Sequence, residues 1–216
     1  MCEVSLYTTQ YEEDKEIIPS GFSVLPNLER SVLDVYSELK VRKLPLIADI
    51  LKVLQENSNA DYFIYTNVDI GLMPHFYTYV ALQIANGHDA LVINRRRLLS
   101  KYLKVEELPE IYADLGASHP GFDCFVFKRS LLEKFVLGDI CVGVSFIGVA
   151  LAHNIFSLAK KPLFIPDQHL TFHIGVDVLV PRSNAFYKHN RGEFFTKVQA
   201  ALKPFFKLEK FPYAAL

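Results

Sequence analysis

DYFIYTNVDI, residues 61–70, sets the architecture that we expect for this chain. Residues 62–65 form a continuous run of aromatic and β-branched side chains, which is typical of a strand covered on both faces. The run stops at the polar residues Asn67 and Asp69. The sequence therefore predicts a buried strand that carries these two side chains at its carboxyl end.

Helices and strands alternate on both sides of this stretch. Residues 44–57 place leucine and isoleucine at helical spacing, and a second helix is expected over residues 75–87, after Pro74. DALVI, residues 89–93, reads as another buried strand. This alternation predicts an α/β fold, with a mostly parallel central sheet flanked by helices in a Rossmann-like arrangement. Further strands are expected at residues 4–8, 22–25, 122–127 and 171–174.

Length and composition favour one globular domain over residues 1–216. The 23 Lys and Arg residues nearly balance the 24 Asp and Glu residues, so the net charge of -1 gives no general attraction to nucleic acid or anionic membranes. Three scattered cysteines fit neither a disulfide framework nor a CxxC zinc site, and the first residues lack the pattern of a signal peptide. We therefore expect a cytoplasmic protein with no nucleic-acid partner.

Residues 140–159 lack Asp, Glu, Lys and Arg and are about as long as a membrane span. Polar residues such as His153 and Asn154 lower their apolarity, and the turn-like residues 137–139 offer an N-cap. We therefore expect a core helix and no transmembrane span. For the C-terminal extension, residues 187–216, we expect a helix that covers the sheet, with a partner surface or a membrane-surface contact as alternatives.

Polar residues follow several of the expected strands. In open α/β sheets, ligands bind beyond the carboxyl ends of the strands, so we expect Asn67 and Asp69, residues 94–97 and the loop around Asp123 to converge. The alternative for Asn67 and Asp69 is a simple turn, because Asn and Asp readily bond to nearby backbone groups.

The pattern IYTNVDIGLMPHFY resembles the GT-A glycosyltransferase superfamily of nucleotide-diphospho-sugar transferases, with Asn67-Val68-Asp69 in the place of the DxD motif. LPLIADIL before it, and HPGFDCFVFKR and TFHIG after it, extend the resemblance over roughly residues 3–180. The resemblance implies a hexosyltransferase-type enzyme, which moves a sugar from a nucleotide diphosphate sugar to an acceptor hydroxyl.

A divalent metal, Mn²⁺ or Mg²⁺, is the cofactor that the resemblance implies, with Asp69 and His173 as its ligands. Both ions prefer oxygen ligands and would stabilise the charge that develops on the leaving diphosphate. Asn67 stands where the family usually has the first Asp, and an amide contributes no charge, so we expect metal affinity to be weakened. A core or turn histidine is the alternative reading of His173.

Further roles also follow from the resemblance. Thr8, Asn67, Asp69, Arg95 and Arg96 would bind the nucleotide sugar, and Asp123 would be the catalytic base or would orient the acceptor. The arginines could equally belong to a solvated basic loop, and Asp123 could be a structural carboxylate.

Two other functions stay open for this chain. Asn67 suggests a non-catalytic binding or partner module that has kept the fold and lost a full metal site. A nucleotidyltransferase is disfavoured, because no glycine-rich phosphate loop follows the first strand. The donor, the acceptor, the stereochemistry and the oligomeric state are not readable from the sequence.

Overall fold

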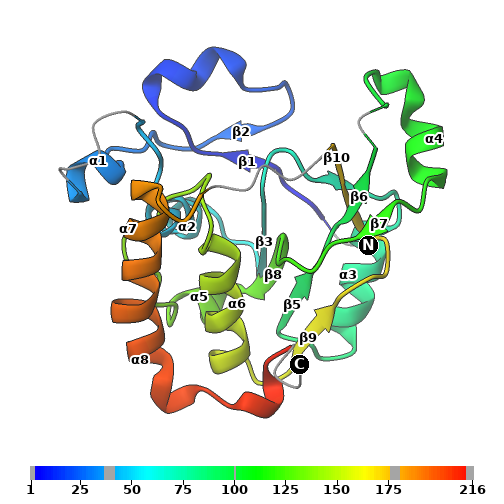
Figure 1. Ribbon diagram of the computed structural model, residues 1–216. Helices are drawn as coiled ribbons and strands as arrows, with labels where there is room; N and C mark the ends of the chain where they lie inside the picture. Colours follow the sequence, from blue (N-terminus) through cyan, green and yellow to red (C-terminus); the bar gives the residue numbers. More distant parts are fainter. Residues whose placement is uncertain (1–2, 37–41, 100, 176–180, 213–216) are drawn as a thin grey trace.

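A computed structural model describes residues 3–36, 42–99, 101–175 and 181–212 of the chain. Its main sheet has the strand order β3 (Tyr62–Thr66), β8 (Cys124–Lys128), β5 (Ala90–Ile93) and β9 (Pro162–Ile165). Helices lie on both sides of this sheet, so the α/β architecture is confirmed (Figure 1). All four residues of β5 are buried, as expected for a strand covered on both faces.

Alternate residues of the strands feed two hydrophobic cores. Ala90 and Val92 pack with α2 (Ile47–Asn57) and α6 (Ile147–Leu158), whereas Leu91 and Ile93 pack with α3 (Phe76–Ala85). This alternation is the period of two that strand geometry imposes. The helices α2 and α3 lie within the ranges expected from the sequence.

The direction of β8 differs from the expected parallel arrangement. It runs antiparallel to both β3 and β5, whereas β5 and β9 are parallel. Three strands therefore point one way and β8 points the other. The reason is that the described residues between the two strands, 94–99 and 101–123, make no helical crossover over a face of the sheet. The chain re-enters the sheet at the end where it left, which gives an antiparallel neighbour.

A second sheet has the order β4 (Gly71–Leu72), β10 (Thr171–Ile174), β6 (Arg96–Leu98) and β7 (Ala117–Ser118). β10 is parallel to β6 and antiparallel to β4. A separate pair, β1 (Tyr7–Thr8) and β2 (Ser23–Val24), is parallel and shorter than the strands expected there.

The apolar stretch at residues 140–159 forms a shorter helix than expected. α6 begins only at Ile147, because Cys141 forms a β-bridge with Leu46 and Val142 N donates to the carbonyl of Pro45. The expected N-cap is therefore wrong, and Asp139 instead pairs with Lys197. Within the described residues, no helix is both long enough and apolar enough to cross a membrane.

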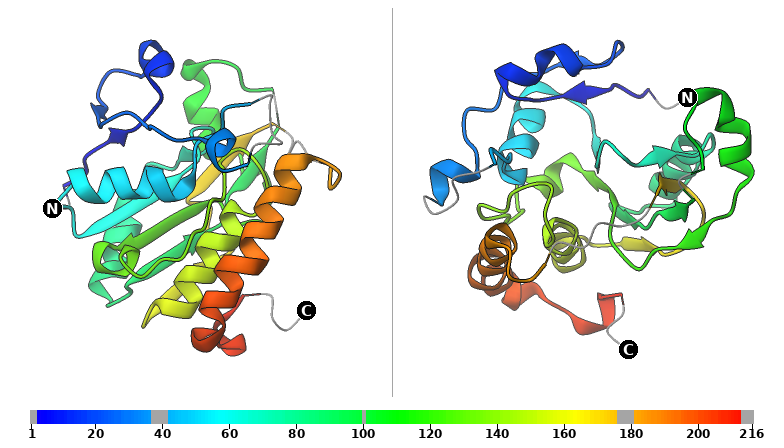
Figure 2. Two further views of the ribbon diagram at one scale, coloured as in Figure 1. Left: turned by 90° about the vertical axis from the view of Figure 1, so that its left-hand side faces the viewer. Right: turned by 45° about the horizontal axis from the view of Figure 1, so that its top comes forward.

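The C-terminal segment covers the sheet side that carries α6, as expected. α7 (Ala185–Glu193) continues into the π-helix η3 (Phe194–Gln199) and α8 (Ala200–Leu202), beside α6 in both views of Figure 2. Phe194, Val198 and Leu202 are buried in the core that includes α6. The remaining short helices are η1 (Glu12–Ile17), α1 (Val32–Val35), η2 (Val105–Glu107), α4 (Leu108–Ala113), α5 (Arg129–Leu132), η4 (Lys203–Phe205) and η5 (Leu208–Lys210).

Candidate functional site

The polar residues that follow the strands of the main sheet lie at one end of that sheet. Thr66 and Ile93, the last residues of β3 and β5, are both register partners of Cys124, the first residue of β8. Because β8 runs antiparallel to β3 and β5, Asp123, which precedes β8, lies at the end of the sheet where β3 and β5 finish. The Thr66 hydroxyl donates to the Asp123 carbonyl over 3.3 Å. The residues that follow β3 and β5 and the residue that precedes β8 therefore lie at the same end of the main sheet.

Asn67, Val68 and Asp69 form an exposed turn after β3, closed by a hydrogen bond of 3.2 Å from Ile70 N to the Asn67 carbonyl. The Tyr65 hydroxyl donates to Asn67 Oδ1 over 3.5 Å, at the long limit of a hydrogen bond. Burial, and then the charge of Asp69, raise the pKa of Tyr65, which keeps the hydroxyl protonated. The turn reading is thus correct for the backbone, and the side chains remain accessible to a ligand.

Asp69 meets His173 across the second sheet. His173 Nε2 lies 3.3 Å from Asp69 Oδ2, and the pair becomes ionic when the imidazole is protonated. His173 lies in β10, so the expected strand is confirmed. Its Nδ1 is buried with no hydrogen-bond partner among the described residues. The structure therefore joins a carboxylate to an imidazole, two groups that are separated by more than a hundred residues in the sequence.

These two groups are suited to a shared metal ion but do not complete a site. A carboxylate oxygen and a neutral imidazole nitrogen are both metal donors. In the described part of the chain, no cluster of three or more His, Cys, Asp or Glu side chains could hold a metal. Mg²⁺ is commonly bound by one or two carboxylates together with substrate phosphates and water, and Asp69 fits that mode, whereas an imidazole such as that of His173 is not a usual Mg²⁺ ligand.

The three consecutive arginines face different partners. Arg96 pairs with Asp167, and its Nη2 donates to the Gly116 carbonyl over 3.1 Å. Arg97 is the register partner of His173, so these two residues share a face of the second sheet. Arg97 is exposed, and its Nη2 donates to the Ser118 carbonyl over 3.5 Å. Arg97 therefore lies on the face of the second sheet that carries His173, whereas Arg96, its neighbour in β6, lies on the opposite face.

Arg95 forms a buried ion pair with Asp123. The two side chains are 12% and 7% exposed, and Arg95 N also donates to Asp123 Oδ2 over 3.3 Å. His119 Nε2 lies 3.9 Å from Asp123 Oδ1, close to Gly121, where an added Cβ would come within 2.3 Å of that nitrogen. The sequence placed Asp123 and Arg95 in separate roles, and the structure shows them as one unit with His119 beside it.

Thr8 lies in the separate β1–β2 pair, where its carbonyl accepts a hydrogen bond of 2.8 Å from Leu25 N. Its expected contact with a nucleotide stays a prediction.

Comparisons with known proteins give likenesses to solved structures alone. No family model matches the sequence, and no curated protein matches it. Staphylococcus aureus TarS 1-349 in complex with UDP-GlcNAc is 13% identical with a TM-score of 0.44, over 81% of this chain and 59% of TarS. Mycobacterium tuberculosis glucosyl-3-phosphoglycerate synthase with Mn²⁺, UDP-glucose and phosphoglyceric acid is 16% identical with a TM-score of 0.48, over 91% of this chain and 67% of the synthase.

A further solved structure, described as a mycobacterial protein, is 15% identical with a TM-score of 0.48. The match spans 88% of this chain and 63% of that protein. The chain therefore spans less than two thirds of the length of TarS and of this mycobacterial protein. Identities and TM-scores at this level do not assign the chain to a family.

Proposed function

We propose that the protein transfers a sugar from a nucleotide diphosphate sugar to an acceptor hydroxyl. The observation that carries this proposal is the contact of 3.3 Å between Asp69 and His173 at the end of β3. These residues stand at two motif positions of the glycosyltransferase resemblance, and they are distant in the sequence. A coincidental DxD-like triplet would have no reason to meet the second motif.

In this proposal, Asp69 and His173 bind the donor diphosphate through a divalent metal, with phosphate oxygens and water as the other ligands. The metal, when bound, neutralises the charge that develops on the leaving diphosphate. Asn67 adds a neutral amide at the same turn, and exposed Arg97 supplies a positive charge on the face of His173. An arginine at this place offsets the charge that the motif lacks at Asn67.

In this proposal, Asp123 orients the acceptor. Its carboxylate accepts hydrogen bonds from the Arg95 guanidinium and from Arg95 N, and in this proposal it also accepts one from the acceptor hydroxyl. An ion pair of this kind also makes a carboxylate a weaker base. The geometry therefore favours orientation of the acceptor hydroxyl over its deprotonation among the two roles proposed for Asp123.

Isothermal titration with UDP-GlcNAc, UDP-glucose and the corresponding GDP, CDP and dTDP sugars, each with and without Mn²⁺, tests donor binding. We expect Asp69→Asn to weaken binding of the preferred donor by at least tenfold. Asp61→Asn is the matched control, because Asp61 is an exposed aspartate at the opposite end of β3. The proposal fails if no donor binds or if the two variants bind alike.

Asn67→Asp separates a metal-dependent site from a simple turn. With a second carboxylate at the turn, we expect tighter Mn²⁺ binding and a stronger dependence of donor binding on the metal. Release of the nucleoside diphosphate on addition of acceptors then measures transfer. If a donor binds but no tested acceptor causes release of the nucleoside diphosphate, the protein is a binding module and not an enzyme.

A further inference from the structure

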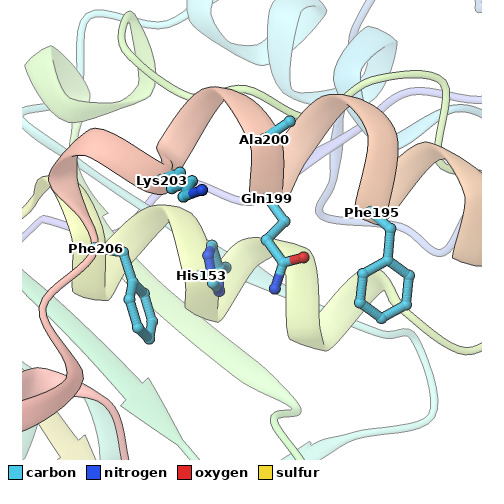
Figure 3. A pocket seen from close by; sticks show the side chains of 6 residues that line it. All are labelled: His153, Phe195, Gln199, Ala200, Lys203 and Phe206. Carbon is cyan, nitrogen blue, oxygen red and sulfur yellow. The ribbon is translucent and has the colours of Figure 1, made fainter.

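A cavity of about 340 Å³ lies between α6 and the C-terminal helix, outside the candidate sugar site. His153 of α6 forms part of its wall, with residues of η3, α8 and the chain that follows (Figure 3). Its lining residues are His153, Phe195, Gln199, Ala200, Lys203 and Phe206. Close by, Lys210 Nζ donates to the carbonyl of Ala159, which follows α6 and precedes β9. The C-terminal end of α6 lies near the start of β9. Because β3 and β9 point the same way, Asp69, which follows β3, lies at the opposite end of the main sheet.

His153 lines the cavity and carries a polar atom that no described residue satisfies. Its side chain is buried, with the residue 5% exposed, and Nε2 has no hydrogen-bond partner among the described residues. The rings of Phe194, Phe206 and Phe211 surround the imidazole at centroid distances of 5.5, 5.2 and 5.0 Å. Burial lowers the pKa of His153, so the imidazole is neutral at pH 7. Nε2 itself has almost no accessible surface, so a ligand in the cavity would meet the aromatic rings around the imidazole.

The backbone above the cavity is unusual as well. η3 is a π-helix, a form that occurs mostly as short insertions in α-helices and often at functional sites. Residues four apart are almost in line in a helix with i→i+5 hydrogen bonds, so Phe195 and Gln199 lie on one side of η3. Both point toward the cavity in Figure 3.

The chemistry of the lining selects a ligand with a flat apolar body and a negative charge. Phe195 and Phe206, which are 43% and 37% exposed, supply aromatic surface. Lys203 is exposed and has no ion-pair partner among the residues that the structure describes. The lining contains no acidic residue. A ring suits the aromatic walls, and a carboxylate can accept hydrogen bonds from the lysine ammonium.

We propose that this cavity is a second binding site, which takes a small aromatic carboxylate. The ring packs against Phe195 and Phe206, and the carboxylate accepts hydrogen bonds from Lys203. The volume is at the small end of the range for ligand sites and suits a single ring with one substituent. Nothing in this proposal depends on sugar transfer.

Benzoate is the probe, titrated into the ¹⁵N-labelled full chain while amide chemical shifts are recorded. We expect saturable shifts at millimolar benzoate, confined to α6 and to residues 194–206. Benzamide has the same shape without the charge, and we expect it to bind at least about threefold more weakly, as loss of an exposed ion pair implies. Shifts that do not saturate, or that centre on residues 67–69, would overturn the proposal.

Two variants assign the charge to its residue. Lys203→Met keeps an apolar stem and removes the ammonium, and we expect it to weaken benzoate binding by roughly threefold to fivefold. Lys207→Met is the matched control, since Lys207 is exposed and lies outside the lining. Gln199→Leu tests the neighbouring amide without touching the core. Equal affinities in the two lysine variants would refute the proposed site.

Discussion

Replacing Asp123 with Asn should cost far more stability than the same change at Asp167, although each residue pairs with an arginine of the same triplet. Asp123 and Arg95 are 7% and 12% exposed, whereas Asp167 is 50% exposed beside Arg96. Removal of one partner from a buried ion pair leaves an uncompensated charge and costs about 3–5 kcal/mol. The amide of Asn still accepts hydrogen bonds, so we expect about 3 kcal/mol for Asp123→Asn, the lower end of that range.

For a chain of this length, about 3 kcal/mol corresponds to a fall in Tm of roughly 6–12 °C. Asp167→Asn should cost less than about 1 kcal/mol, because solvent screens an exposed pair. Urea unfolding followed by far-UV circular dichroism measures both, with an unchanged m-value as the condition for comparison. The double variant Arg95→Met with Asp123→Leu should recover much of the loss, because no charge is then left unpaired. Costs for the two Asn variants within about 0.5 kcal/mol of each other would refute this account of the pair.

Other perturbations have equally definite outcomes. Gly71→Ala should destabilise by about 1–3 kcal/mol in urea, because its Cβ would lie 2.3 Å from Phe172 Cζ, whereas Gly192→Ala in the open part of α7 should stabilise by up to about 1 kcal/mol. Burial and nearby carboxylates raise the pKa of Tyr11 to about 12, so stability should fall as pH rises from about 10 to about 12, and Tyr11→Phe should lessen that fall. Burial lowers the pKa of His153, so the stability that its neutral form contributes is complete above pH 6.5 and is lost as pH falls. His153→Phe should therefore lessen the fall in stability between about pH 7 and pH 5. Iodoacetamide followed by peptide mapping should leave Cys124 and Cys141 unmodified in the native protein, because burial raises the pKa of both thiols.

Local patterns predicted much of the sheet and its helices. The apolar runs at β3 and β5 and the helical spacing in α2 need no distant partner to be recognised, because burial on one or both faces sets their periodicity. Local patterns could not predict the residue at which α6 begins. It depends on the bridge between Cys141 and Leu46, a contact across nearly a hundred residues.

The same limit applies to the candidate site. The polar residues at the ends of the strands indicated which end of the sheet would carry Asp69 and Asp123. The direction of each strand, and the residue with which each side chain pairs, depend on contacts between distant parts of the chain. The pairing of Asp123 with Arg95 follows from the antiparallel direction of β8, which no residue near Asp123 encodes. The contact of Asp69 with His173 was anticipated through a family resemblance and not through residue spacing.

The ion pair of Arg95 and Asp123 has a consequence for how the protein can diversify. Ile93 and Cys124 are register partners, so the chain leaves and rejoins the main sheet at adjacent positions. The ion pair links the first residues after β5 to the residue before β8. Lengthening a flexible loop costs only about 0.6 kcal/mol for each doubling of its length. Around α4, buried Ile111 packs with Met73 and Phe172, so only the exposed positions of this excursion can change in sequence and length beside the candidate site, while both attachment points stay joined to the main sheet.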